Sequence, residues 1–187
     1  FDKDDVKAVE NLDNVTDVMP SYFADLVLKS NGNGGNGKVI RVSAAPKSYN
    51  NNKTLNTLNI KEGRLPEKKG EILVEYGSVG SSDYKIGDKV VFESESGESN
   101  ALDMVDTLEY TVVGKVESPM YISYQRGSTT IGNGNIEAFM YIYQDDFVTE
   151  RYTEMYVKTA FSDGDGSAFD DEYEKDIESF TTVLENT

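Results

Sequence analysis

The chain has 187 residues, enough to bury a sizeable core as one domain or as two small ones. Its 18 basic and 34 acidic side chains give a net charge of −16, which argues against partners such as nucleic acid or anionic lipid. Because the chain contains no cysteine and no histidine, disulfides, thiolate metal sites, the usual zinc ligands and a Ser-His-Asp triad are excluded.

The first part of the chain predicts a helix followed by a hairpin. Residues 4–12 carry apolar side chains on one helical face and acidic residues in the first turn, as in a short amphipathic helix. Residues 15–30 are extended in character, and residues 38–45 alternate in polarity. The Asn/Gly-rich tract at 31–37 would join the two as antiparallel strands.

The middle of the chain predicts a β-rich block that follows a polar, asparagine-rich stretch at residues 46–57. Within it, Gly87 and Asp88 predict a chain reversal, because glycine accepts positive φ and aspartate hydrogen-bonds nearby backbone. The expected strands are at 72–74, 90–92, 108–117, 121–125 and 139–143.

The last part predicts a strand at residues 152–161 and an amphipathic helix at residues 169–184. Together with the opening helix and hairpin, this order predicts an α+β fold. A mixed α/β subdomain would be built from residues 1–57 and 148–187. Residues 58–147 would form an inserted β-rich subdomain.

Residues 32–38 match two glycine-rich phosphate-binding patterns, G-x-x-x-x-G-K and G-x-G-x-x-G. A phosphate-binding loop needs Ser or Thr after the lysine and then the N-terminus of a helix. Val39 follows instead, and the next residues are β-branched, as in a strand. We therefore interpret the tract as a hairpin turn.

A partial calcium-loop spacing precedes the last helix. Asp163, Asp165, Ser167 and Glu174 occupy positions 1, 3, 5 and 12 of such a loop, but Ala168 stands where the sharp turn favours glycine. The alternatives left open are a calcium site and an acidic loop that caps the helix, and we expect no metal site.

The remaining chemical candidates are carboxylates and tyrosines. Asp145 and Asp146 are adjacent, so on a strand they would point to opposite faces, and we expect both to be solvated residues at a strand end. Four tyrosines on the expected strands form either a recognition surface or, for about half of them, part of the core. They are Tyr121, Tyr124, Tyr141 and Tyr143.

A series of short motifs in a fixed order resembles the extracytoplasmic core domain of MacB/FtsX-type ABC transporter permeases. The motifs are I-x-x-G-R-x-P at 60–66, G-E-I-L-V at 70–74, Y-K-I-G-D-K-V at 84–90 and Y-T-V-V-G-K-V-E-S-P at 110–119. The opening at 4–20 is similar to the first helix and strand of that domain, and residues 141–147 and 152–157 are similar to members from Gram-positive bacteria.

The resemblance implies a non-catalytic domain on the extracytoplasmic side of the cell membrane. A cytoplasmic ATPase would hydrolyse ATP, and the permease, as a dimer, would use that energy for export, extraction or force transmission on peptides, lipids or lipoproteins. It implies no catalytic residue and no cofactor. The motif residues that carry over as structural are Gly63, Arg64, Pro66, Glu71, Gly87, Asp88 and Gly114.

The chain begins at Phe1 rather than Met, so we expect it to be a fragment of a longer, membrane-integrated protein. The main alternative is a secreted or wall-attached module that binds peptide or glycan through its tyrosine-rich strands. A carboxylate-dependent hydrolase is the other alternative, although the sequence does not position an acid or a base for it.

Overall fold

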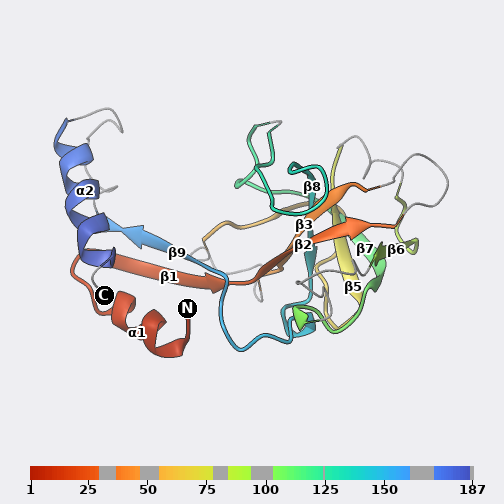
Figure 1. Ribbon diagram of the computed structural model, residues 1–187, viewed down its shortest axis with the longest axis horizontal. Coiled ribbons are helices and arrows are strands. Elements are labelled where there is room, and N and C mark those ends of the chain that lie inside the picture. Colours follow the sequence, from red (N-terminus) through yellow and green to blue (C-terminus); the bar gives the residue numbers. More distant parts are fainter. Residues whose placement is uncertain are drawn as a thin grey trace. The chain divides into compact units, whose positions relative to one another are not determined.

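The computed structural model describes residues 1–29, 37–46, 55–77, 84–93, 103–123, 125–160 and 171–185 (Figure 1). Contacts divide the chain into two units. The smaller consists of Phe1–Ser21 with Arg151–Thr187, and the larger of Tyr22–Glu150. The pairing of the two chain ends in one unit agrees with the α+β arrangement predicted from the sequence. Within the described residues, no helix is long and apolar enough to cross a membrane.

The smaller unit contains helix α1 (Lys3–Glu10), strand β1 (Val15–Ser21), strand β9 (Glu154–Thr159) and helix α2 (Asp171–Glu185). The Asp2 side chain caps α1 by accepting hydrogen bonds from the backbone amides of Asp4 and Asp5, at 2.8 and 3.1 Å. Val6 and Val9 on the apolar face of α1 are buried. β1 and β9 form an antiparallel two-stranded sheet. The predicted helices and the strand at 152–161 are confirmed here, within a few residues.

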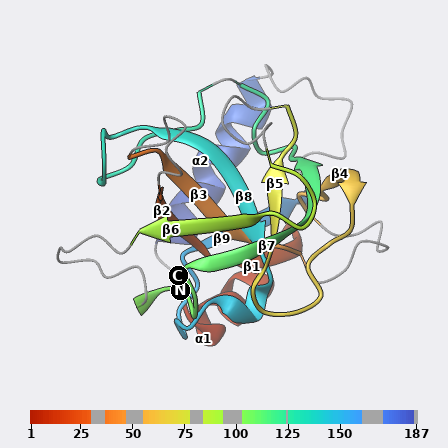
Figure 2. The ribbon, with the colours of Figure 1, turned by 90° about the vertical axis from the view of Figure 1, so that its right-hand side faces the viewer.

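The larger unit is a seven-stranded sheet of mixed parallel and antiparallel pairs, in the order β4-β7-β5-β8-β3-β2-β6. β6 also pairs with β7, and Figure 2 shows these two strands side by side. The strands from β7 through β5, β8, β3 and β2 to β6 therefore close on one another, and β4 is added at β7. Their bounds are β2 Phe23–Leu28, β3 Val39–Ala44, β4 Asn59–Gly63, β5 Glu71–Glu75, β6 Lys89–Glu93, β7 Glu109–Glu117 and β8 Ile136–Ile142.

Alternate residues of these strands supply two separate apolar clusters. On β5, for example, Ile72 and Val74 belong to the larger cluster, whereas Leu73 belongs to the smaller one. Tyr110 of β7 is also fully buried in the larger cluster. Burial of both faces explains why β5 appears in the sequence as a continuous apolar run.

The predicted hairpin at residues 15–45 is confirmed only in its second part. β2 and β3 are antiparallel neighbours, but they lie in the larger sheet, where β3 also pairs in parallel with β8. β1 is separate from this hairpin and pairs with β9. The division by contacts at Ser21 therefore differs from the boundary expected near residue 57.

Candidate functional site

The residues expected to be structural gather along β7. Gly114 lies on this strand, and the backbones of five others are paired with it or hydrogen-bonded to it. These are Gly63, Arg64, Glu71, Gly87 and Asp88. Pro66 is buried in the segment that connects β4 to β5. Three of the four sequence motifs thus converge on β7, the strand that the fourth motif forms.

β4 and β7 approach each other so closely at Gly63 and Gly114 that neither position has room for a side chain. A Cβ on Gly63, whose φ is +74°, would lie 2.1 Å from the Val113 carbonyl oxygen. A Cβ on Gly114 would lie 2.7 Å from the carbonyl oxygen of Glu62. Since backbone atoms cannot move aside easily, glycine is required at both positions.

Arg64 and Glu71 form a bidentate ion pair beside this crossing. The two guanidinium nitrogens donate to the two oxygens of Glu71 at 2.8 and 2.7 Å, and the Glu67 amide donates to Oε2 at 2.9 Å. The hydrogen bonds from Arg64, with a contribution from Glu67, lower the pKa of Glu71 to about 2 against the burial of the carboxylate. Glu71 therefore stays ionised and serves to fix the segment between β4 and β5.

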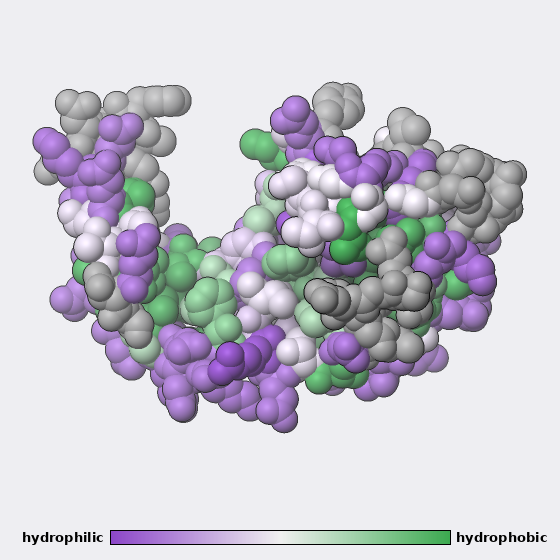
Figure 3. Space-filling model, in the orientation of Figure 1, coloured by the Kyte–Doolittle hydropathy of each residue, from purple (hydrophilic) through white to green (hydrophobic). Residues whose placement is uncertain are grey.

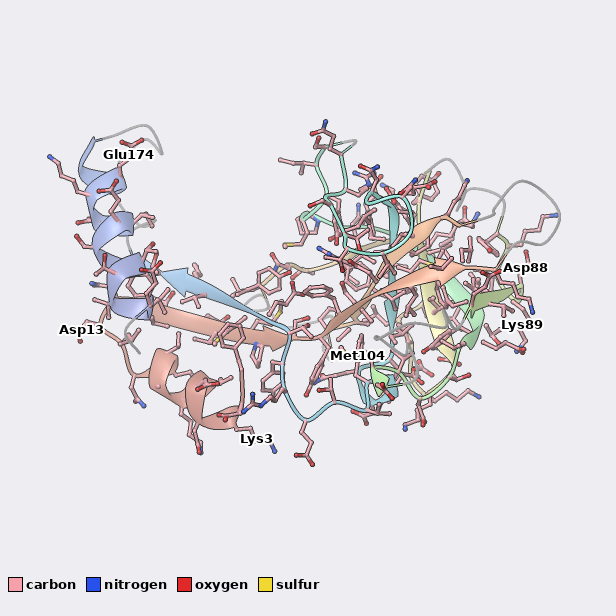
Figure 4. The ribbon with its side chains drawn as sticks, in the orientation of Figure 1. Lys3, Asp13, Asp88, Lys89, Met104 and Glu174 are labelled. Carbon is pink, nitrogen blue, oxygen red and sulfur yellow. The ribbon has the colours of Figure 1, made fainter. Side chains whose placement is uncertain are left out.

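Gly87 and Asp88 form the predicted turn. The Asp88 carboxylate accepts from the Lys85 amide at 2.8 Å, and Gly87 has a φ of +97°. The Gly87 amide donates to the Val112 carbonyl, and the Val112 amide donates to the Asp88 carbonyl. The turn therefore delivers the chain to the start of β6, where Figure 4 labels Asp88 and Lys89.

A further ion pair, buried on both sides and not predicted from the sequence, joins Glu75 of β5 to Arg126 of the loop before β8. The side chains of Glu75 and Arg126 are 5% and 13% exposed. The signal in the sequence was that Glu71 and Glu75 flank a buried apolar run, because a carboxylate next to such a run needs a cationic or amide partner.

Asp146 overturns the expectation that the Asp145–Asp146 pair is solvated. Asp145 is exposed, but Asp146 is fully buried in a short 3-10 helix, η2 (Gln144–Asp146). The Gly70 amide donates to its oxygens at 3.1 and 3.3 Å. Burial raises the pKa of Asp146 to about 6, and the charges of Asp106 and Asp145 add to this, while Gly70 and Lys69 oppose it.

The three tyrosines of this group that the structure describes do not form one open surface. Tyr141 is buried, and its hydroxyl lies 2.8 Å from the Ser118 hydroxyl. Tyr121 stacks on Phe139 with ring centroids 4.3 Å apart, Tyr143 is half-buried, and Tyr124 lies outside the described residues. The strand expected at 121–125 is wrong, because the described residues of this stretch form a loop.

The metal and nucleotide candidates gain no support from the described residues. Asp163, Asp165 and Ser167 lie outside them, and only Glu174, on α2, is described (Figure 4). The described part of the chain contains no group of three or more acidic side chains that could hold a metal ion. β3 begins directly after Lys38, where a phosphate-binding loop requires a helix.

No family model and no curated protein matches the sequence. The fold matches the extracellular domain of YknZ, a noncanonic ABC-type transporter from Gram-positive bacteria, with a TM-score of 0.52 and 14% identity over 87% of this chain and 75% of that one. The periplasmic region of MacB from Actinobacillus actinomycetemcomitans matches at a TM-score of 0.46 and 12% identity, over 98% and 74% of the two chains. The chain therefore has an α+β fold similar to that of the YknZ extracellular domain, as the resemblance in its sequence predicted.

Proposed function

We propose that this chain is the non-catalytic extracytoplasmic domain of an ABC transporter permease. The observation that carries the proposal is the similarity in fold to the YknZ extracellular domain, together with the convergence of the motif residues on β7. The domain would couple ATP hydrolysis by a cytoplasmic ATPase to export, extraction or force transmission outside the membrane. The permease would act as a dimer on a peptide, lipid or lipoprotein.

The construction of the larger unit suits a domain that transmits movement. Its strands close on one another, and two ion pairs, each with a buried carboxylate on β5, fix the neighbouring segments. The motif carboxylate Glu71 is ionised, and donors occupy both of its oxygens, so it is poorly placed to transfer a proton. These features favour a mechanical role over a chemical one.

The location can be tested with an added cysteine, because residues 1–187 contain none, and the unsubstituted full-length protein is the control for labelling elsewhere. We would introduce Lys68→Cys, at an exposed position, into the full-length protein in its own bacterium and add a membrane-impermeant maleimide. We expect labelling in intact cells and retention of the protein in salt-washed membranes. Labelling only after lysis would contradict an extracytoplasmic location, and release of the protein into the medium would favour a secreted module.

Coupling needs a separate measurement on the purified transporter in nanodiscs. A Fab fragment that binds the larger unit should change the rate of ATP hydrolysis if this domain moves during the transport cycle. A Fab against an unrelated protein is the control. An unchanged rate of ATP hydrolysis at saturating Fab would count against coupling but would not bear on the proposed extracytoplasmic location.

A further inference from the structure

The loop between β7 and β8 carries the most exposed large apolar side chain among the described residues. Ile122 is 94% exposed, and Met120 on the same loop is 39% exposed. Figure 3 shows hydrophobic surface on this loop among hydrophilic residues. Single exposed apolar residues are common on protein surfaces, so the inference depends on how the loop holds Ile122.

Arg126 fixes the backbone on both sides of Ile122. Its guanidinium donates to the carbonyl oxygen of Tyr121, at 3.3 Å, and to that of Ser123. The same guanidinium also forms an ion pair with the buried carboxylate of Glu75 on β5. The two carbonyls flank Ile122, so the backbone on each side of this exposed residue is hydrogen-bonded to Arg126.

Aromatic packing fixes the loop a second time. Tyr121 stacks on Phe139 of β8, and the guanidinium carbon of Arg126 lies 5.8 and 5.6 Å from the centroids of these two rings. Buried contacts with the sheet thus hold the residue before Ile122. A backbone held in advance loses little entropy when the residue that it presents is bound.

The loop is also uncharged, in contrast to the rest of the chain. Residues 118–136 contain no Asp or Glu and one basic residue, Arg126, whose charge is balanced by Glu75. The whole chain carries −16. A partner surface that contacts this loop does not need charged residues to balance charges on the loop. The surface that best complements the loop is therefore itself uncharged.

We propose that this loop docks into an apolar, uncharged pocket of a partner protein, with Ile122 inserted and Met120 packed at its rim. A bilayer fits less well, because two apolar side chains are a weak anchor and the net charge of −16 repels anionic lipid. A second copy of the same loop also fits less well, because a projecting side chain needs a concave site and this loop offers only another projecting side chain. The proposal does not depend on the transporter assignment.

The test uses the full-length protein in its own cells, with the photo-crosslinking amino acid p-benzoylphenylalanine at Ile122. The matched control places the same amino acid at Val148, which is 46% exposed in the same unit. We expect one discrete protein adduct from position 122 and none from position 148, identified by mass spectrometry. Absence of an adduct, or adducts only with lipid or a second copy, would overturn the proposal.

The identified partner is then purified, and its Kd is measured for the wild type, Ile122→Glu and Val148→Glu. We expect Ile122→Glu to weaken binding at least about tenfold and Val148→Glu to leave it unchanged. The melting temperature of Ile122→Glu should equal that of the wild type, because this side chain is 94% exposed. Equal Kd values for the three proteins would refute the proposal.

Discussion

The ion pair between Arg64 and Glu71 makes a sharp prediction, because its two partners differ in burial. The Arg64 side chain is 45% exposed, whereas the Glu71 side chain is 6% exposed. Glu71→Gln leaves an arginine that water can solvate. Arg64→Met removes two of the three hydrogen bonds described above for the buried Glu71 carboxylate and leaves the one from the Glu67 amide. We therefore expect Arg64→Met to be the more destabilising substitution.

The pKa of Glu71 gives the magnitude. A decrease from 4.5 to about 2 corresponds to about 3 kcal/mol of stabilisation at neutral pH. Because solvent screens the half-exposed Arg64, we expect Glu71→Gln to lower the free energy of unfolding by about 2 kcal/mol. Arg64→Met should lower it by about 3 to 4 kcal/mol, since it strands a buried charge.

The pH dependence follows from the direction of the shift. The pKa is lower in the folded state than in the unfolded state, so this stabilisation is complete above about pH 4.5 and is lost as the pH falls towards 2. The difference between wild type and Glu71→Gln should therefore shrink in acid.

Urea denaturation followed by circular dichroism, at several pH values, measures these differences. The control is Glu109→Gln, which removes the exposed ion pair with Lys89 and should cost less than about 1 kcal/mol. A larger loss for Glu71→Gln than for Arg64→Met at pH 7 would refute the reasoning, as would a loss for Glu71→Gln that is the same at every pH.

Three further predictions concern single positions. Gly114→Ala should lower the free energy of unfolding, measured by urea denaturation, by about 3 kcal/mol, because the new Cβ would meet backbone oxygens. Gly70→Ala, at a site with open space, should lower it by about 1 kcal/mol. Equal losses for the two variants would contradict the close approach of β4 and β7 at Gly114. Gly87→Val should lower the melting temperature through its positive φ, and Gly87→Asn should lower it less; an unchanged melting temperature for the valine variant would count against this. The pKa of Asp146 is raised from 3.8 to about 6, so above pH 6 the folded state carries a buried charge that costs up to about 3 kcal/mol. Asp146→Asn should therefore have a higher free energy of unfolding than the wild type at pH 7.5, and this difference should disappear near pH 4. A difference that is the same at every pH would contradict the raised pKa of Asp146.

Much of the fold was predictable because periodicity in the sequence reports local burial. The run at 72–74 and the alternation at 108–117 correspond to β5 and β7, and the Gly87–Asp88 turn is where it was expected. β4 was missed because Asn59–Gly63 is an exposed strand without apolar alternation. The stretch 121–125 has the composition of a strand, but Arg126 binds its carbonyl groups and holds it as a loop.

The candidate site was predictable only in part, since its chemistry depends on contacts between distant segments. The motifs led us to expect a structural role for Arg64 and Glu71 but did not show that the two side chains pair. Burial of Asp146 depends on the Gly70 amide, which lies far away in the sequence, and no local pattern reports such a contact. The division into units depends in the same way on the parallel pairing of β3 with β8.

The pairing of β1 with β9 has a consequence for how the chain folds. β1 precedes the seven strands of the larger unit in the sequence, whereas its partner β9 follows them, so β1 cannot pair until those strands have been synthesised. Strands β2 to β8 are complete before β9 appears, so the larger unit is able to fold first. Because long-range pairing is slow, the two-stranded sheet should form last. Until then β1 has an unpaired edge that is available for misassembly, so a folding defect should appear first in the sheet of β1 and β9.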